Sequence, residues 1–139
     1  MPDYRFTSRI EVRYGDLDPQ GHLNNAKYFT YMEQARFHYL AVVGLWTPAQ
    51  GYEALGQIVA KAECTYLRPV FLGEIVEVSV RTARLGTKSI DMEYQLTVAG
   101  EAVATGRTLQ VAYDYTARQS IPVPPDWRDR IAAFEGRTF

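Results

Sequence analysis

The feature that most constrains the fold of this chain is one long stretch of helical periodicity set among segments with strand periodicity. Over residues 25–43, apolar side chains recur at intervals of three and four, as on one face of a helix. The helix is bounded by Asn24 or Asn25 as a cap and by Gly44 and Pro48 as a stop signal. Additional apolar residues widen its face, so we expect most of the helix to be buried under a sheet.

Five other segments have the composition and spacing of strands. Residues 9–14 alternate strictly between polar and apolar, which is the period of a half-buried strand. After the helix, four β-rich runs bounded by Gly or Pro cover residues 58–67, 74–82, 89–98 and 102–113. A short helix is predicted at 127–134. The order strand, long helix, four strands, short helix predicts an α+β fold in which the long helix packs on an antiparallel sheet.

Composition narrows the class of protein further. A chain of 139 residues, 47% hydrophobic, predicts a single domain over residues 1–139. The net charge of −1 removes the electrostatic case for general binding to nucleic acid or an anionic membrane. Cys64 is the one cysteine, and no Cys/His cluster has the spacing of a structural zinc site, so we expect no metal. No window has the pattern of a secretory signal or a membrane span, which predicts a cytoplasmic protein.

The polar loop between the first strand and the long helix contains the candidate site. Asp18 precedes the helix and is placed to act as a base or a nucleophile on a carbonyl group. The backbone amides of Asn25 and Ala26 lie at the positive end of the helix dipole, where they can receive an oxyanion. His22 lies between these groups and can orient water or substrate. We expect Asp16 to cap the turn or orient the loop.

The loop motif Asp-Leu-Asp-x-x-x-His-x-Asn-Asn-x-x-Tyr, residues 16–28, closely resembles that of the hotdog-fold thioesterases. The similarity is to the 4-hydroxybenzoyl-CoA thioesterase-like branch and its acyl-ACP thioesterase relatives, and residues 66–74 and 84–89 resemble later segments of that family. The resemblance implies a hotdog fold, in which a five-stranded antiparallel sheet wraps the long helix. It also implies a homodimer or homotetramer whose protomers pair edge to edge, with active sites at the dimer interface.

The activity implied by the resemblance is hydrolysis of an acyl-CoA or acyl-ACP thioester to a free acid and a thiol. No cofactor is implied, since coenzyme A enters only as part of the substrate. Asp18 maps onto the catalytic carboxylate, acting either as a nucleophile or as a general base, and the amides of Asn25 and Ala26 map onto the oxyanion site. His22 carries over from the acyl-ACP relatives, and Gln20 stands where they have Asn.

Further residues are candidates for holding the substrate. Tyr28 belongs to an aromatic stripe on the helix that can hold an acyl or aryl group. Arg68 and Lys88, with Ser89 beside it, can bind the phosphates of CoA through charge-assisted hydrogen bonds.

Two alternative functions remain open at the level of sequence. One is a hotdog enoyl-thioester hydratase or dehydratase, whose signature is partly matched by residues 15–22. Here Asp18 replaces the Asn of that signature, and one extra residue separates Pro19 from His22. The other is a non-catalytic module that binds acyl thioesters, since a fold does not determine a function.

Overall fold

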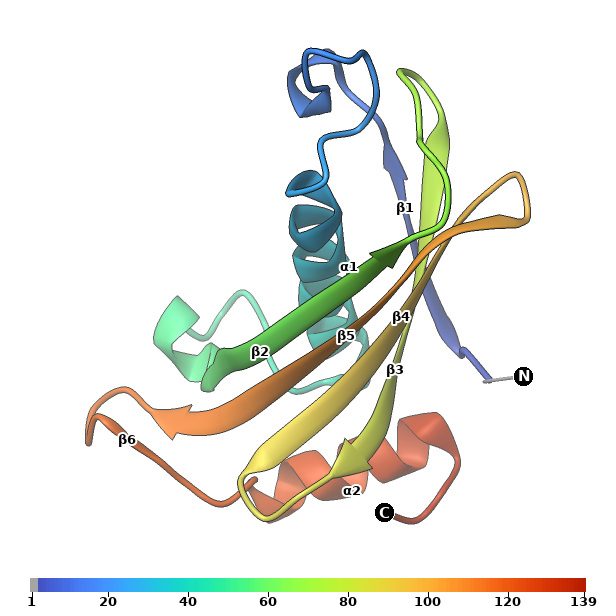
Figure 1. Ribbon diagram of the computed structural model, residues 1–139. Helices are drawn as coiled ribbons and strands as arrows, with labels where there is room; N and C mark the ends of the chain where they lie inside the picture. Colours follow the sequence, from blue (N-terminus) through green and yellow to red (C-terminus); the bar gives the residue numbers. More distant parts are fainter. Residues whose placement is uncertain (1–2) are drawn as a thin grey trace.

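The computed structural model describes residues 3–139 (Figure 1). Its elements, in chain order, are β1 (Phe6–Glu11), the 3₁₀ turn η1 (Tyr14–Asp16), α1 (Lys27–Val43), the 3₁₀ turn η2 (Tyr52–Leu55), β2 (Gln57–Tyr66), β3 (Ile75–Leu85), β4 (Ser89–Val98), β5 (Glu101–Asp114), β6 (Gln119–Ser120) and α2 (Pro125–Glu135). The predicted α+β order is confirmed. The additions to it are the two 3₁₀ turns and the two-residue strand β6.

All strand pairs in the sheet are antiparallel, in the order β1-β3-β4-β5-β2, with β6 added beside β5. The sheet curls about α1, and α2 lies at the end of the sheet opposite the loop that follows β1 (Figure 1). The strands β1 and β2 are therefore the two edges of the main sheet. None of the helices within residues 3–139 is long and apolar enough to cross a membrane.

The first strand and the long helix have bounds slightly different from those predicted. The strand β1 ends at Glu11 and not at Tyr14, because Tyr14 enters a 3₁₀ turn that Asp16 closes against Arg13. The helix α1 begins at Lys27, and it is terminated by Gly44, whose φ of 89° is the predicted left-handed stop.

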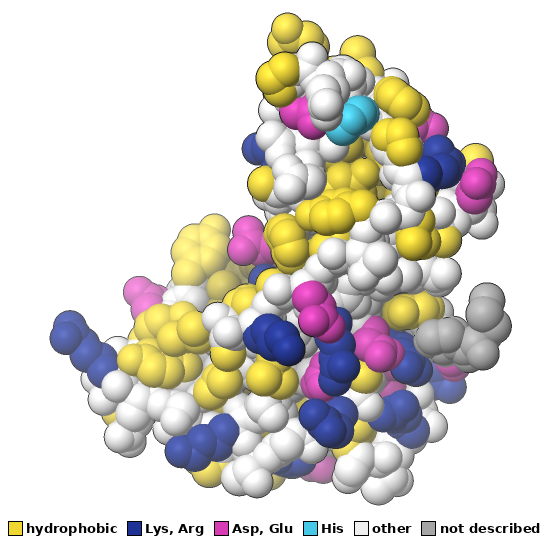
Figure 2. Space-filling model, in the orientation of Figure 1, with side chains coloured by type: hydrophobic (Ala, Val, Ile, Leu, Met, Phe, Trp, Pro, Cys, Tyr) yellow, Lys and Arg dark blue, Asp and Glu magenta, His cyan; other side chains and the backbone are white. Residues whose placement is uncertain are grey.

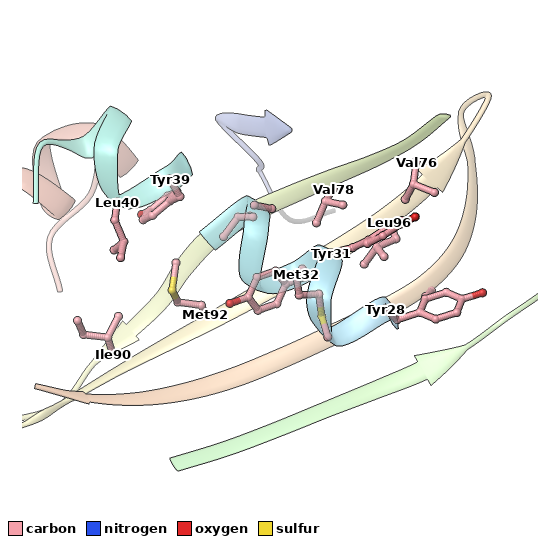
Figure 3. Packing of buried hydrophobic residues seen from close by; sticks show 14 of the residues in the cluster. Tyr28, Tyr31, Met32, Tyr39, Leu40, Val76, Val78, Ile90, Met92 and Leu96 are labelled. Atoms are coloured by element: carbon pink, nitrogen blue, oxygen red, sulfur yellow. The ribbon is translucent and has the colours of Figure 1, made fainter. Parts of the chain in front are cut away.

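One face of α1 packs into the concave side of the sheet. Tyr28, Tyr31, Met32, Tyr39 and Leu40 lie against β3 and β4 side chains such as Val78, Met92 and Leu96 (Figure 3). The prediction that most of the helix is buried is wrong, since Val42 is 59% exposed and Gln34 and His38 are also exposed. The sheet of one chain covers only one side of the helix, so the opposite side remains open to solvent.

The close approach of α1 to the sheet depends on a glycine in β5. A Cβ atom at Gly106 would collide with the sulfur of Met32, which is fully buried. Because glycine has no side chain, the helix can lie directly on β5 at this point. This contact fixes the height of α1 above the sheet.

Candidate functional site

A cleft opens where the loop after β1, the start of α1 and the end of β2 meet. Its volume is about 420 Å³. Apolar side chains lie beside a histidine and acidic groups at this end of the molecule (Figure 2). The lining residues come from all three segments: Asp18, Gln20, His22, Leu23, Asn25, Tyr28, Tyr66, Leu67, Arg68 and Pro69. The structure therefore brings together six of the nine residues predicted for the site.

The loop that carries Asp18 is a tight turn closed by backbone hydrogen bonds. The amide of Asp18 donates to the carbonyl of His22 at 3.0 Å, and the amide of Gly21 donates to the carbonyl of Asp18 at 3.0 Å. Gly21 has a φ of 83°, which a residue with a side chain rarely adopts. The amide of Leu23 donates to the carbonyl of Val70 at 2.7 Å, which anchors the turn on the segment after β2.

The two carboxylate oxygens of Asp18 have different surroundings. Its Oδ1 accepts a hydrogen bond from the amide of Gln20 at 2.9 Å, which fixes the orientation of the carboxylate. Its Oδ2 lies 3.4 Å from Nδ1 of His22. The side chains of Asp18 and His22 are 17% and 32% exposed, so both can be reached from the cleft. A carboxylate held in this way can act on a bound carbonyl group or on a water molecule.

Asp16 lies beneath the turn and supports it. Its Oδ2 accepts a hydrogen bond from the Tyr31 hydroxyl at 2.6 Å, and its Oδ1 accepts one from Arg13 Nη2 at 3.0 Å. Burial raises the pKa of this carboxyl group, but the bonds from Arg13 and Tyr31 outweigh it and lower the pKa to about 2. The backbone carbonyl of Asp16 accepts a bond from the amide of Asn24 at 2.9 Å. These contacts fit the orienting role predicted for Asp16.

The start of α1 presents one free amide rather than two. Asn24 Oδ1 accepts a hydrogen bond from the amide of Ala26 at 3.0 Å, so the cap residue already occupies one of the two donors predicted for an oxyanion. The amide of Asn25 has no acceptor among residues 3–139, and Asn25 is exposed at the cleft. The Asn25 carbonyl, which lies in the next peptide along the chain, accepts a hydrogen bond from the Tyr66 hydroxyl at 2.7 Å. The Ala26 amide is thus engaged by the Asn24 side chain, whereas the Asn25 amide has no acceptor among residues 3–139.

Two tyrosines form the apolar wall of the cleft. The rings of Tyr28 and Tyr66 pack edge to face, with centroids 4.8 Å apart. Tyr28 is 3% exposed, and burial raises the pKa of both hydroxyl groups. Sequence reasoning did not assign Tyr66, Leu67 or Pro69 to the site, although all three lie in the segment 66–74 that resembles a recurrent segment of the thioesterases.

The predicted phosphate-binding residues are split between two places. Arg68 lines the cleft, where its Nε lies 3.6 Å from Glu101 Oε1. Lys88 and Ser89 lie at the turn between β3 and β4, at the other end of the sheet (Figure 1). Lys88 Nζ donates to Ser120 Oγ at 3.3 Å. Within one chain, Lys88 and Ser89 do not reach the cleft.

Comparison with known families identifies the class of this protein. The model of the thioesterase-like superfamily matches residues 12–131, which include the whole cleft. The chain belongs to this superfamily. The match supports thioester hydrolysis as its general activity, and it confirms the predicted resemblance.

Individual relatives of this superfamily member cover nearly all of its length. It is 26% identical over 132 residues to the 1,4-dihydroxy-2-naphthoyl-CoA hydrolase of Synechococcus elongatus, covering 93% of this chain and 95% of that protein. It is 24% identical over 128 residues to the long-chain acyl-CoA thioesterase FadM of Escherichia coli, covering 89% and 95%.

A solved crystal structure is similar to this chain in both sequence and fold. The crystal structure of a thioesterase from Thermus thermophilus, complexed with coenzyme A and Zn, shares 40% sequence identity with it. The alignment covers 100% of both chains with a TM-score of 0.87. The fold is therefore the predicted hotdog fold. Among residues 3–139 of the present chain, no three His, Cys, Asp or Glu side chains form a group that could hold a metal ion.

Proposed function

We propose that this protein hydrolyses acyl-CoA thioesters to a free acid and CoA, with Asp18 as the catalytic carboxylate. One observation carries the proposal: the Asp18 carboxylate and the free amide of Asn25 line the same cleft at the start of α1. A thioester carbonyl in this cleft can accept a hydrogen bond from that amide while its carbon faces the carboxylate. The general activity of the superfamily supports this assignment.

The oxyanion that develops during the reaction is stabilised by the start of α1. The Asn25 amide donates to the carbonyl oxygen, and the positive end of the helix dipole adds to the stabilisation. The Tyr66 hydroxyl donates to the Asn25 carbonyl, in the peptide next to the one that carries this N–H, and so restrains the Asn25 backbone before substrate binds. Preorganised donors of this kind lose no orientation free energy at the moment of reaction.

Two routes use the same carboxylate. In the first, Asp18 takes a proton from a water molecule, whose oxygen attacks the carbonyl carbon, and the C–S bond breaks to release the thiolate. In the second, a carboxylate oxygen of Asp18 attacks the carbonyl carbon and the C–S bond breaks to expel the CoA thiolate; water then hydrolyses the mixed anhydride to the free acid and restores Asp18. In both routes His22, with Nδ1 3.4 Å from Asp18 Oδ2, positions the carboxylate or the water. Neither route requires a metal or an organic cofactor.

CoA is the thiol that the comparisons favour over an acyl carrier protein. The Thermus thermophilus relative was solved as a complex with coenzyme A, and the two named curated relatives act on CoA thioesters. The guanidinium of Arg68 at the cleft suits a phosphate of CoA. We also propose that the protein acts in the cytoplasm.

We also propose that the protein is a homodimer, or a dimer of dimers, paired through the edge of β2. This ten-residue edge strand has no neighbour on its outer side among the described residues, and nearly all its residues are exposed. Ile58, Val59 and Tyr66 are between 39% and 43% exposed. A long apolar edge strand is a template for pairing with a second chain. Sedimentation equilibrium tests this directly, and a monomer at micromolar concentration contradicts it.

The experiment that tests the function is thiol release from short, medium, long and aromatic acyl-CoAs. Asp18→Asn is compared with wild type and with Asp114→Asn. Asp114 is a matched control. Like Asp18, it accepts a hydrogen bond on Oδ1 from the backbone amide of the second residue after it, here Thr116 at 2.8 Å, but it lies outside the cleft. We expect wild type and Asp114→Asn to release thiol and Asp18→Asn to lose nearly all activity while remaining folded.

Two results contradict the proposal. If wild type binds acyl-CoA but releases no thiol, the protein is a binding module. If Asp18→Asn releases thiol at the wild-type rate, another group performs the chemistry. If wild type instead adds water to an enoyl-CoA, which is monitored by the change in absorbance of the enoyl-CoA, the protein is a hydratase.

A further inference from the structure

The hydroxyl group of Tyr28 is a free hydrogen-bond donor in the cleft at Asp18. It has no hydrogen-bond partner among residues 3–139, whereas the hydroxyl groups of Tyr31 and Tyr66 each donate one bond. Although Tyr28 as a whole is 3% exposed, its oxygen is not one of the buried polar atoms that lack a partner in the described chain. The ring is therefore enclosed by protein, and the hydroxyl reaches the open space of the cleft.

The Tyr28 side chain points toward the start of α1. Side chains on a helix tilt toward its N-terminus, so each covers the turn that precedes it. Asn25 precedes Tyr28 by three residues, which is about one helical turn. The Tyr28 hydroxyl extends away from the core side chains of the helix (Figure 3), and its ring packs on Tyr66, whose own hydroxyl donates to the Asn25 carbonyl. The Tyr28 hydroxyl and the free Asn25 amide therefore lie at the same end of the cleft.

Two charged groups of the cleft act on the Tyr28 hydroxyl. Burial raises its pKa, the negative charge of Asp18 raises it as well, and the positive charge of Arg68 lowers it. The net effect is a pKa above the ordinary value of 10.0, so the hydroxyl keeps its proton at neutral pH. It can donate a hydrogen bond under these conditions, but it cannot act as a base.

A second copy of the chain is not the natural partner of this hydroxyl. The Tyr28 ring is already enclosed within one chain, so a copy paired along the edge of β2 adds little to its burial. The hydroxyl opens into the cleft that Asp18 and Asn25 also line. It is thus placed to meet substrate.

A thioester offers two atoms to such a donor, the sulfur and the carbonyl oxygen. The thiol of CoA resembles that of a cysteine, whose pKa is about 8.5, so the thiolate leaves without a proton from a tyrosine, whose pKa is higher. The carbonyl oxygen, in contrast, takes up a negative charge in the tetrahedral intermediate of either route. At the start of α1 only the Asn25 amide is free to stabilise that charge, since the Ala26 amide donates to Asn24.

We propose that the Tyr28 hydroxyl is the second donor to the oxyanion, which makes Tyr28 a catalytic residue beside Asp18. No bond to Tyr28 forms or breaks. The hydroxyl keeps its proton and donates a hydrogen bond to the carbonyl oxygen as this oxygen becomes negative, and the bond weakens again when the C–S bond breaks and the carbonyl double bond forms. This inference rests on the proposed thioesterase function.

The test is thiol release by Tyr28→Phe and by wild type, with the acyl-CoA that wild type cleaves fastest. The variant keeps the ring that packs on Tyr66 and loses only the hydroxyl. We expect kcat to fall roughly 10²-fold, a typical effect of removing one oxyanion donor, while KM changes little. The free energy of unfolding in urea should not fall, because no hydrogen bond within residues 3–139 is lost with the hydroxyl.

Tyr113→Phe is the matched control. Tyr113 also packs edge to face on another tyrosine, Tyr115, with ring centroids 5.0 Å apart. Its hydroxyl likewise has no partner in the part of the chain that the structure describes, but it lies on β5, outside the cleft. Tyr113→Phe should release thiol at the wild-type rate.

Two unreactive CoA analogues distinguish an oxyanion donor from a residue that only shapes the cleft. A CoA thioether has no carbonyl oxygen, so wild type and Tyr28→Phe should bind it equally well. A difluoroketone analogue, with a methylene group between the carbonyl carbon and the sulfur, resembles the tetrahedral intermediate once it is hydrated. It should bind Tyr28→Phe roughly tenfold more weakly than wild type, because a hydrogen bond to a charged oxygen is worth at least about that factor.

The outcomes distinguish this inference from the proposed function. If Tyr28→Phe releases thiol at the wild-type rate, or binds both analogues as wild type does, the hydroxyl is not an oxyanion donor although thioesterase activity stands. If kcat is unchanged but sedimentation equilibrium shows a weaker dimer, the hydroxyl contacts the second copy and the inference is wrong. If wild type cleaves no thioester, both the proposed function and this inference fail.

Discussion

The hydroxyl of Tyr31 lies 2.6 Å from Oδ2 of Asp16 and donates a hydrogen bond to it. Tyr31 belongs to the buried face of α1, and Asp16 precedes the turn that carries Asp18. This contact therefore couples the position of the catalytic carboxylate to the packing of the helix. The amide of Asn24 extends the connection by donating to the carbonyl of Asp16 at 2.9 Å.

Replacing Tyr31 with Phe should destabilise the protein by about 1.5–3 kcal/mol, which is the typical contribution of a hydrogen bond to a charged group. The ring that packs in the core is retained, so the loss is due to the hydroxyl alone. Urea denaturation measures the change. Tyr52→Phe, at a tyrosine that is 75% exposed, should change the free energy of unfolding very little. Equal stability of Tyr31→Phe and wild type would show that the bond contributes nothing.

The stability of the protein should fall in acid because of Asp16. Its pKa is about 2 in the folded chain, against an ordinary value of 3.8. Since folding lowers this pKa, the stabilisation is complete above about pH 4 and is lost as the pH falls toward 2. It amounts to about 2 kcal/mol.

The measurement is the free energy of unfolding of wild type and Asp16→Asn across this pH range. Asp16→Asn should be less stable than wild type at neutral pH, and its free energy of unfolding should change less between about pH 4 and pH 2. Asp126→Asn, at an exposed residue of α2, serves as the control. Parallel curves for wild type and Asp16→Asn would assign the acid sensitivity to another group.

Two substitutions distinguish the backbone amide of Asn25, the proposed oxyanion donor, from the Asn25 side chain. Asn25→Ala keeps the backbone amide, so we expect activity close to wild type. Asn25→Pro removes the N–H, and no hydrogen bond among the described residues is lost with it. We expect a fall in kcat of roughly 10²–10³-fold in the proline variant. Circular dichroism should confirm that both variants fold, and full activity in a folded Asn25→Pro would exclude this amide as the donor.

The close contact between α1 and β5 predicts a large effect of one added methyl group. In Gly106→Ala the new Cβ would collide with the sulfur of the buried Met32, and overpacking of this kind costs about 1–3 kcal/mol. Thermal denaturation measures the loss. Gly15→Ala is the matched control, because a Cβ there meets no atom within 4 Å. If both variants melt together with wild type, the helix can move away from the sheet without cost.

Local patterns were sufficient to predict most of the fold. The alternation of residues 89–98 predicted the bounds of β4 as observed, because side chains on that strand alternate between the core and the outer face, although Asp91 is buried as well. Gly44 marked the end of α1, because its left-handed conformation is a local property of the backbone. The end of β1 was missed, because it depends on the contacts of Asp16 with Arg13 and Tyr31.

The candidate site also has a part that could be predicted from the sequence and a part that could not. The loop motif placed Asp18, His22 and Asn25 together because they lie within eight residues of one another, and short spacing limits how far they can separate. The sequence could not show that the Asn24 side chain accepts the hydrogen bond of the Ala26 amide, since that depends on the rotamer of Asn24. Nor could it show that Lys88 and Ser89 lie at the opposite end of the sheet from Arg68.

The superfamily, the α+β order and the loop that carries the carboxylate were all readable from the chain alone, because periodicity and short-range motifs are properties of neighbouring residues. The residues that complete the cleft, and the burial of Gln57 and Gln110 in one cavity without partners among the described residues, became visible only in three dimensions. The physical reason is that these residues are brought together by the pairing of β2 with β5 and by the packing of α1 on the sheet. Gln57 and Gln110 are more than fifty residues apart in the sequence, and Tyr28 and Tyr66 are 38 apart, so no local pattern indicates these contacts.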